Sequence, residues 1–219
     1  MILVLQEVLA PAEAAVLLRE SAGLGFGDGR ATAGRYAREV KANDQALPST
    51  ARDAILARAE AALRAHPVFA SAARPRAMTP LMLSRYRQGQ TYGLHVDDAL
   101  MGGLRTDLSF TLLLSDPTGY DGGALVIEDT LEPRAFRLNA GDAILYPSTT
   151  LHRVTPVTRG ERIAIVGWVE SWLRDPAQRE ILFDLDRAVA EVHARDGHCD
   201  LFNTLAKTRS NLLRIWAGA

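Results

Sequence analysis

The spacing of apolar and polar residues predicts a run of β-strands in the middle of the chain. Over residues 80–87 the side chains alternate, and Leu81 and Leu83 share one face. Successive side chains of a β-strand point to opposite faces, so this alternation indicates a strand. Similar short segments follow, separated by turns rich in Asp, Asn, Gly and Pro: the segment around His95 and residues 107–115, 122–128, 134–138, 142–146, 151–155 and 162–170. Such spacing is typical of an all-β sandwich or barrel, and we predict a jelly-roll core over residues 79–171.

Helical patterns precede this core. Residues 11–22 carry apolar residues at helical spacing, and a second helix is expected to begin at Ser49 or Thr50. Thr50 and Asp53 resemble a capping box at its start. Between the two helices, the Gly23–Gly34 stretch holds five glycines and is expected to be a loop.

The C-terminal part returns to helical spacing. Asp175 is suited to cap a helix that starts at Pro176. A last helix holds Leu205, Leu212, Leu213 and Trp216. The expected fold is therefore mainly β with flanking helices (α+β): a mixed region over 1–78 that packs on the core, the core over 79–171, and C-terminal helices over 172–219. The sequence leaves open whether these last helices form a subdomain, pack on the core or join a second subunit as a homo-oligomer.

Composition narrows the functional classes. The chain has 219 residues, a formal net charge of -1 and a pI near 6.5, so it lacks the basic surface expected of a nucleic-acid-binding protein. Cys199 is the only cysteine, which excludes an internal disulfide and fits a reducing cytoplasm. The N-terminus does not resemble a signal peptide, and no segment approaches the ~20 apolar residues of a membrane helix. We expect a cytoplasmic protein without a membrane partner.

Three residues could hold a metal ion. In the sequence Leu-His95-Val-Asp97-Asp, strand geometry would point His95 and Asp97 to one face. His152 lies in a later predicted strand, and a jelly roll can bring such strands together. Two histidines and one carboxylate form the facial triad of non-haem Fe(II) sites, which leaves coordination positions open. The alternative is a surface histidine and a turn aspartate, since His-x-Asp is common by chance.

Two further residues could bind an acid. Arg162 follows His152 by ten residues, across an expected turn at 158–161, and its planar guanidinium could hold a carboxylate through two hydrogen bonds. The phenol of Tyr86 could donate to the same group. The alternatives are an arginine in a surface ion pair and an amphipathic core tyrosine.

The other residues that could bind a metal are expected to have structural roles. The His198-Cys199-Asp200 sequence lacks the paired spacing of a zinc site and is expected to be a loop. His66 and His193 are expected at helix ends. Residues 98–106 contain Gly102 and Gly103 and could form a lid over the metal site.

Several longer strings carry a family resemblance that covers nearly the whole chain. They are Asp28-Gly-Arg-Ala-Thr-Ala-Gly34, Val40-Lys-Ala-Asn43, Arg85-Tyr-Arg-Gln-Gly, His95-Val-Asp-Asp-Ala-Leu-Met101, Arg105-Thr-Asp-Leu-Ser-Phe, Tyr120-Asp-Gly-Gly-Ala-Leu, Leu145-Tyr-Pro-Ser, Leu151-His-Arg-Val-Thr-Pro-Val-Thr-Arg-Gly-Glu-Arg162 and Asn211-Leu-Leu-Arg-Ile-Trp216. With these strings the chain resembles the Fe(II)/2-oxoglutarate-dependent dioxygenases of the prolyl-4-hydroxylase-like group. It is most similar to the bacterial PKHD-type hydroxylases within that group.

The resemblance implies a double-stranded β-helix with His95, Asp97 and His152 as iron ligands. It implies that Arg162, helped by Tyr86, binds the distal carboxylate of 2-oxoglutarate, with Thr111 as a further candidate for that pocket. The implied reaction converts 2-oxoglutarate and O2 to succinate and CO2 while a substrate C–H bond is hydroxylated. L-ascorbate is implied as a reductant that keeps the iron reduced.

Two other functions remain open from the sequence. A cupin-like metal enzyme that does not use 2-oxoglutarate would give Arg162 and Tyr86 no role. A non-catalytic sensor would bind iron or 2-oxoglutarate without turnover. The substrate, whether a small molecule or a peptide, cannot be read from these residues, because proline as a substrate would rest on fold analogy alone.

Overall fold

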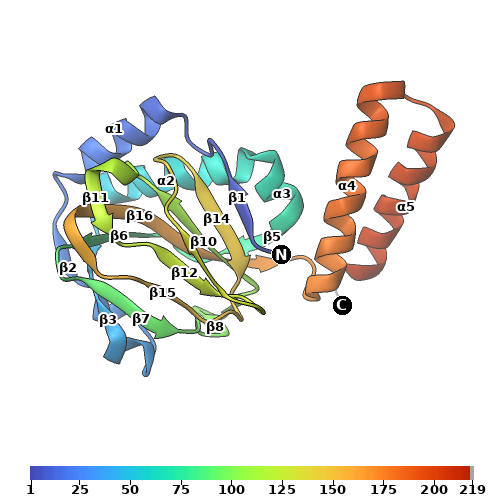
Figure 1. The fold of residues 1–219 in the computed structure, drawn as a ribbon. Coiled ribbons are helices and arrows are strands. Elements are labelled where there is room, and N and C mark those ends of the chain that lie inside the picture. Colours follow the sequence, from blue (N-terminus) through green and yellow to red (C-terminus); the bar gives the residue numbers. More distant parts are fainter. Residues whose placement is uncertain (218–219) are drawn as a thin grey trace.

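Two antiparallel sheets form the centre of the computed structural model, which describes residues 1–217 (Figure 1). The last two positions of the predicted 172–219 region lie outside the described residues. The larger sheet has the strand order β1-β14-β10-β16-β6-β4-β2, with β11 and β5 also paired to β16. The smaller sheet has the order β13-β12-β15-β7-β3, and β8 pairs with β9 alone.

The strands agree with the predicted core and extend beyond it. Those of the larger sheet are β1 Leu3–Leu5, β2 Phe26–Asp28, β4 Asp44–Ala46, β5 Pro75–Met78, β6 Met82–Arg87, β10 Leu108–Leu113, β11 Tyr120–Gly122, β14 Ala143–Pro147 and β16 Val157–Ser171. The others are β3 Lys41–Ala42, β7 Thr91–His95, β8 Leu100–Met101, β9 Leu104–Arg105, β12 Leu125–Glu128, β13 Pro133–Phe136 and β15 His152–Val154. The prediction of a mainly β jelly roll with flanking helices is confirmed. The region before residue 79 adds strands to both sheets.

Helices α1 Pro11–Ser21, α2 Thr50–Ala65 and α3 Pro67–Ala73 cover the outer face of the larger sheet (Figure 1). Their apolar side chains join those of the sheet in one buried cluster. Phe69 of α3, fully buried, meets Phe110 of β10 edge to face at 5.7 Å. A second, smaller cluster lies between the two sheets and includes Tyr86, Tyr146, Ile127 and Val154. The site described below lies beside this inner cluster.

Helix α2 begins at Thr50, as predicted, but its N-cap lies one residue before the predicted one. The N-cap is Ser49, whose Oγ accepts a hydrogen bond of 3.1 Å from the backbone N–H of Arg52. The predicted capping box of Thr50 and Asp53 is therefore wrong. Asp53 forms an ion pair with Arg52 instead, at 2.7 Å.

The glycine-rich stretch is more ordered than predicted. The expected loop over Gly23–Gly34 contains β2, which pairs with β4, and the 3-10 helix η1 Gly29–Thr32. A second 3-10 helix, η2 Ala37–Val40, follows. The error arises because β2 is stabilised by hydrogen bonds to a strand that lies far along the chain. Local composition carries no sign of such a partner.

The expected turn at 158–161 is also wrong. β16 runs through it without a break, and β15 belongs to the other sheet. Gly160, at φ +73°, lies within β16 where β11 pairs with it, and a Cβ there would stand 2.2 Å from the Gly119 carbonyl oxygen. The glycine therefore allows two strands to approach closely and does not reverse the chain.

Helices α4 Pro176–Asp196 and α5 Asp200–Trp216 form an antiparallel hairpin that stands apart from the sheets (Figure 1). Asp175 caps α4 as predicted, since its Oδ1 accepts from the N–H groups of Ala177 and Gln178. The hairpin meets the rest of the chain through α3, and Asp186 of α4 pairs with Arg74 at 2.5 Å. No residue of α5 is buried. Within residues 1–217, none of the helices has the length and hydropathy to cross a membrane.

Candidate metal centre and adjoining cavity

Two histidines meet where β7 and β15 pair in the smaller sheet. His95 and His152 are directly opposed in the strand register, and their rings lie 4.2 Å apart. Both are buried, at 8% and 4% exposure. Asp97 is not on the strand, because β7 ends at His95, so the predicted strand geometry of the His-x-Asp pair is wrong. The chain beyond β7 nevertheless brings the Asp97 carboxylate to both histidines.

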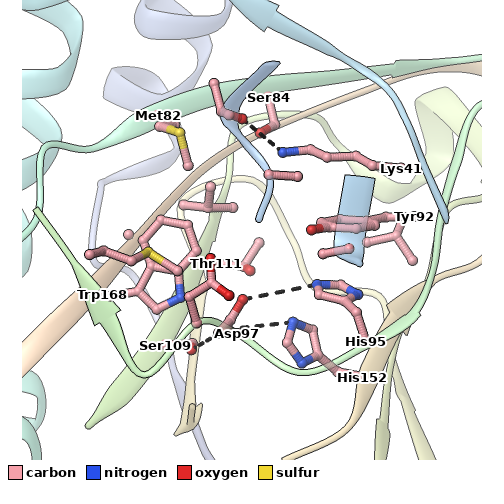
Figure 2. A pocket seen from close by; sticks show the side chains of 18 of the residues that line it. Lys41, Met82, Ser84, Tyr92, His95, Asp97, Ser109, Thr111, His152 and Trp168 are labelled. Carbon is pink, nitrogen blue, oxygen red and sulfur yellow. Dashed lines mark hydrogen bonds and ion pairs between the residues drawn. The ribbon is translucent and has the colours of Figure 1, made fainter. Parts of the chain in front are cut away.

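The three side chains form a compact donor set. Asp97 Oδ1 lies 3.9 Å from His95 Nε2, and Asp97 Oδ2 lies 3.7 Å from His152 Nε2 (Figure 2). One ligand atom from each residue falls within 4.8 Å of the others, and this is the one such cluster found among the described residues. A metal ion at the centre would be reached by two nitrogens and one oxygen.

Backbone carbonyls orient both histidine rings. Nδ1 of His95 lies 2.7 Å from Gly93 O, and Nδ1 of His152 lies 3.0 Å from Thr150 O. A carbonyl only accepts, so each Nδ1 carries the proton and donates it. Each Nε2 is left with a free lone pair, which is the form that binds a metal. Burial, and then the neighbouring His152, lower the pKa of His95 to about 4, so its ring is neutral at pH 7.

Hydroxyl groups of the larger sheet hold the carboxylate. Ser109 of β10 donates to Asp97 Oδ2 at 2.6 Å, and Ser109 Oγ lies 2.8 Å from Ser148 Oγ. The two serines are buried. This contact fixes one carboxylate oxygen and ties the loop after β7 to the opposite sheet.

The donor set opens into a cavity of about 280 Å³ between the sheets. Its size is close to the lower end of small-molecule sites, which span roughly 300–1,000 Å³. Arg162, Tyr86 and Thr111 all line it, as do the three possible metal ligands. The structure therefore brings all six predicted site residues to one cavity.

Arg162 has an unusual environment for a charged residue. It is 2% exposed, and its guanidinium carbon lies 5.4 Å from the ring centre of Tyr86, its direct partner across β16 and β6. Among residues 1–217 its side chain has no hydrogen bond or ion pair, and its buried Nε has no acceptor. A buried charge without a partner costs several kcal/mol. An anionic ligand in this cavity would remove that cost.

Hydroxyl groups line the same cavity as this arginine. Thr111 of β10 is 4% exposed, and Tyr146 of β14 is 3% exposed. Burial raises the pKa of Tyr86 to about 12, although the nearby Arg162 acts in the opposite direction. The phenol is therefore protonated at neutral pH and available as a hydrogen-bond donor.

Three cavity residues, Lys41, Tyr92 and Tyr146, were not predicted from the sequence. Tyr92 stacks on His95 with ring centres 3.6 Å apart. Strict strand alternation would place residues 92 and 95 on opposite faces, but the register shifts between β7 and β15, where Gly93 and Leu94 oppose Arg153 alone. Such a bulge re-aims side chains. The alternation of side chains along its strand could have predicted that Tyr146 faces the cavity. Lys41 could have been singled out because it is one of only two lysines in the chain.

The other candidates have structural roles, as predicted. His66 caps α3 through Nδ1, which accepts from Phe69 N–H at 3.3 Å. Cys199 caps α5, where its Sγ accepts from Phe202 N–H at 3.4 Å. His193 of α4 and His198 of the connection pack against the ring of Phe202. The predicted lid contains the β8–β9 hairpin, and Met101 and Gly102 border the cavity.

Family models match most of the chain in two parts. Residues 81–170 match the 2OG-Fe(II) oxygenase superfamily, and residues 176–218 match the PKHD-type hydroxylase C-terminal domain. A PKHD-type hydroxylase of Maricaulis maris is 50% identical over 218 residues, 99% of each chain. Another, from Synechococcus elongatus, is 52% identical over 197 residues, 88% of each chain.

Solved structures share the fold at low sequence identity. HygX from Streptomyces hygroscopicus, with nickel and 2-oxoglutarate bound, is 13% identical with a TM-score of 0.58, over 78% of this chain and 84% of its own. A prolyl-4-hydroxylase from Pseudomonas putida is 19% identical with a TM-score of 0.53, over 78% of this chain and 92% of its own. The relatives, the oxygenase model and the His-Asp-His cluster agree: the chain belongs to the PKHD-type hydroxylases and is a 2-oxoglutarate- and Fe(II)-dependent dioxygenase.

Proposed function

We propose that His95, Asp97 and His152 hold the Fe(II) ion, through the two Nε2 atoms and a carboxylate oxygen. The donor set fits this metal, because two imidazoles and one carboxylate leave positions open for other ligands. Bound there, the iron would supply the activation of O2 that oxidises 2-oxoglutarate to succinate and CO2 and inserts one oxygen atom into a substrate C–H bond. The protein contributes the orientation of the ligands and the exclusion of water.

We further propose that Arg162 binds the distal carboxylate of 2-oxoglutarate. The observation that carries this assignment is the buried guanidinium without an acceptor, in the cavity that also contains the His-Asp-His cluster. A carboxylate would accept two parallel charge-assisted hydrogen bonds from such a group. No counter-ion within residues 1–217 competes for this role.

Tyr86 and Thr111 are proposed to complete the carboxylate site. Both are buried, carry a hydroxyl and line the cavity with Arg162. Burial keeps the Tyr86 phenol protonated, so it would donate to the carboxylate and not repel it. Leu125 and Val154 of the smaller sheet line the same cavity and exclude water, which strengthens each of these polar contacts.

The test is metal-dependent turnover of 2-oxoglutarate. The purified protein with Fe(II) should convert 2-oxoglutarate to succinate, and His152→Ala should abolish both this conversion and Mn(II) binding. His193→Ala is the matched control, because it removes a histidine that packs on Phe202, far from the metal centre. Full Mn(II) affinity in His152→Ala would contradict the ligand assignment. Failure of both wild-type binding and turnover would contradict the iron site altogether.

Three other features remain predictions. Ascorbate is proposed as a reductant for the iron, and dependence of turnover on added ascorbate would test it. Cytoplasmic location is proposed because the single cysteine fits a reducing compartment. The substrate of the hydroxylation, a small molecule or a peptide, is the third.

The C-terminal helices remain a proposed separate region. Residues 176–218 match a family model of their own, and the α4–α5 hairpin contacts the rest of the chain mainly through α3. α5 leaves Leu201 and Ile215 exposed at 52% and 68%. Homo-oligomer formation through this hairpin is tested by the molar mass in solution of the full chain and of an Ile215→Glu variant.

A further inference from the structure

Lys41 is a buried cation at the wall of the cavity. It lies on β3, is 6% exposed, and has Nζ 5.0 Å from the ring centre of Tyr92. Its Nζ donates one hydrogen bond of 3.0 Å to Thr32 Oγ1. An ammonium group has three N–H donors, so two are left without a protein acceptor among the described residues.

No carboxylate neutralises this charge. Within residues 1–217, no Asp or Glu oxygen lies within the 4.0 Å of an ion pair with Lys41. The two acids whose charges act on it are otherwise engaged: Asp28 pairs with Arg30, and Asp97 faces the histidines and Ser109. Burying a cation without a partner is unfavourable, so an unpaired one at a cavity wall indicates an anionic ligand.

The cosubstrate does not account for this second cation. In the proposed site, the distal carboxylate of 2-oxoglutarate would bind Arg162 and not Lys41. Figure 2 shows Lys41 on the other side of Tyr92 from His95. With the distal carboxylate assigned to Arg162, the unpaired ammonium of Lys41 indicates a further anionic group, and the molecule still to be placed is the substrate.

The opposite wall offers a further donor. Nε1 of Trp168 on β16 is buried and has no acceptor among the described residues, and the indole lines the same cavity. Figure 2 shows Trp168 and Met82 across the cavity from Lys41 and Tyr92. The cavity wall thus contains the Lys41 ammonium, an indole N–H without an acceptor and apolar surface. This suits an acceptor-bearing, acidic molecule with an apolar part.

We propose that Lys41 anchors a negatively charged group of the substrate, a carboxylate or a phosphate, and that Trp168 donates to an acceptor on the same molecule. The inference rests on the proposed iron and 2-oxoglutarate sites and adds the chemical class of the substrate. Lys41 would act as a specificity-determining residue, because a neutral analogue would leave the ammonium unpaired.

The experiment uses fluorine-labelled probes with the full-length protein loaded with Zn(II) and 2-oxoglutarate. Fluorobenzoate, fluorophenyl phosphate and neutral fluorobenzamide are titrated separately and followed by ¹⁹F NMR. The two anions distinguish a carboxylate site from a phosphate site. The expected result is that at least one anion binds about tenfold or more tightly than the amide, a difference of about 1.4 kcal/mol. Lys41→Met should abolish this preference.

The controls separate the inference from the proposed function. Lys207→Met removes the other lysine, on the exposed side of α5, and should keep the anion preference. Lys41→Met should keep the wild-type affinities for Zn(II) and 2-oxoglutarate, which also shows that it folds. The inference is overturned if anions show no preference in the wild type, whether all probes bind alike or none binds at millimolar concentration. It is also overturned if the preference survives in Lys41→Met, or if that variant loses 2-oxoglutarate binding as an Arg162 variant does. If the wild type binds neither Zn(II) nor 2-oxoglutarate, the proposed function itself has failed.

Discussion

Replacing Arg162 by methionine should have opposite effects on ligand binding and on stability. Arg162 is 2% exposed, and no acceptor satisfies its Nε in the described chain. An arginine with a structural role would have a protein partner, and its removal would destabilise the fold. Arg162→Met removes an unpaired buried charge and keeps the apolar stem. The free protein should therefore be as stable as the wild type or more so, while the affinity for 2-oxoglutarate falls.

The expected change in the Kd for 2-oxoglutarate follows from the interactions that Arg162 makes in the ligand-bound protein. With 2-oxoglutarate bound, the guanidinium and the distal carboxylate would form a buried, doubly hydrogen-bonded pair, and Arg162→Met would leave that carboxylate without its partner. Removing one member of a buried pair costs about 3–5 kcal/mol. Each 1.4 kcal/mol is a tenfold change, so the Kd for 2-oxoglutarate should rise by roughly a hundredfold to a few thousandfold.

Two measurements test this pair of effects. Isothermal titration calorimetry with the Mn(II)-loaded protein gives the Kd of 2-oxoglutarate, and urea unfolding of the metal-free protein gives the free energy of unfolding. Arg134→Met is the control, because Arg134 forms an exposed ion pair of 3.5 Å with Asp129 and should change neither quantity. An unchanged Kd in Arg162→Met would refute the carboxylate assignment. A loss of several kcal/mol of stability would show that Arg162 has a structural role.

Three further predictions concern the metal site, the ionisation of Lys41 and the core. Ser109→Ala removes the 2.6 Å hydrogen bond to Asp97 and should weaken Mn(II) binding by roughly 10- to 100-fold, measured by calorimetry; an unchanged affinity would refute a role for this contact. Desolvation lowers the pKa of Lys41 to about 8 in the folded protein, against 10.5 for a free lysine. Between these two pH values the folded protein loses the proton of Lys41 while the unfolded chain keeps it, so the free energy of unfolding rises with pH. The wild type should therefore gain about 2 kcal/mol of stability over Lys41→Met between pH 8 and 10, and parallel urea-unfolding curves would contradict this. Phe69→Ala should cost about 3–5 kcal/mol in urea unfolding, because Phe69 is fully buried against Phe110, and a loss below about 1 kcal/mol would contradict this packing.

The strands were predictable because one face of each is buried. Alternation over residues 80–87 corresponds to β6, and the segment predicted over 107–115 corresponds to β10, which is buried along its full length. Pairing between distant segments was not predictable from such local patterns. The glycines near residue 27 gave no sign of β2, because this strand is held at the sheet edge by β4. Continuity of β16 through Gly160 was missed for the same reason, since the fit of that glycine depends on β11.

The sequence grouped His95, Asp97 and His152, which the structure brings together, although the geometry assumed for them was wrong. The spacing of His95 and Asp97 suggested a shared strand face, whereas the structure places Asp97 beyond the end of β7 and holds it through Ser109. Residue types therefore predicted which side chains cluster better than strand periodicity predicted their geometry. The positions of Lys41 and Tyr92, by contrast, could not be predicted from the sequence. Their positions depend on η1 and on the bulge in β7, and neither feature follows from the sequence pattern.

Because the site lies between the two sheets, ligands bound there are expected to stabilise the fold. The smaller sheet supplies His95 and His152, while the Asp97 carboxylate is fixed by Ser109 on the larger sheet. Arg162, proposed for the distal carboxylate, also lies on the larger sheet. A metal ion and 2-oxoglutarate bound together would link the two sheets at several points. Because ligands that bind only the folded state stabilise it by mass action, the free energy of unfolding should rise more with both ligands present than with either alone.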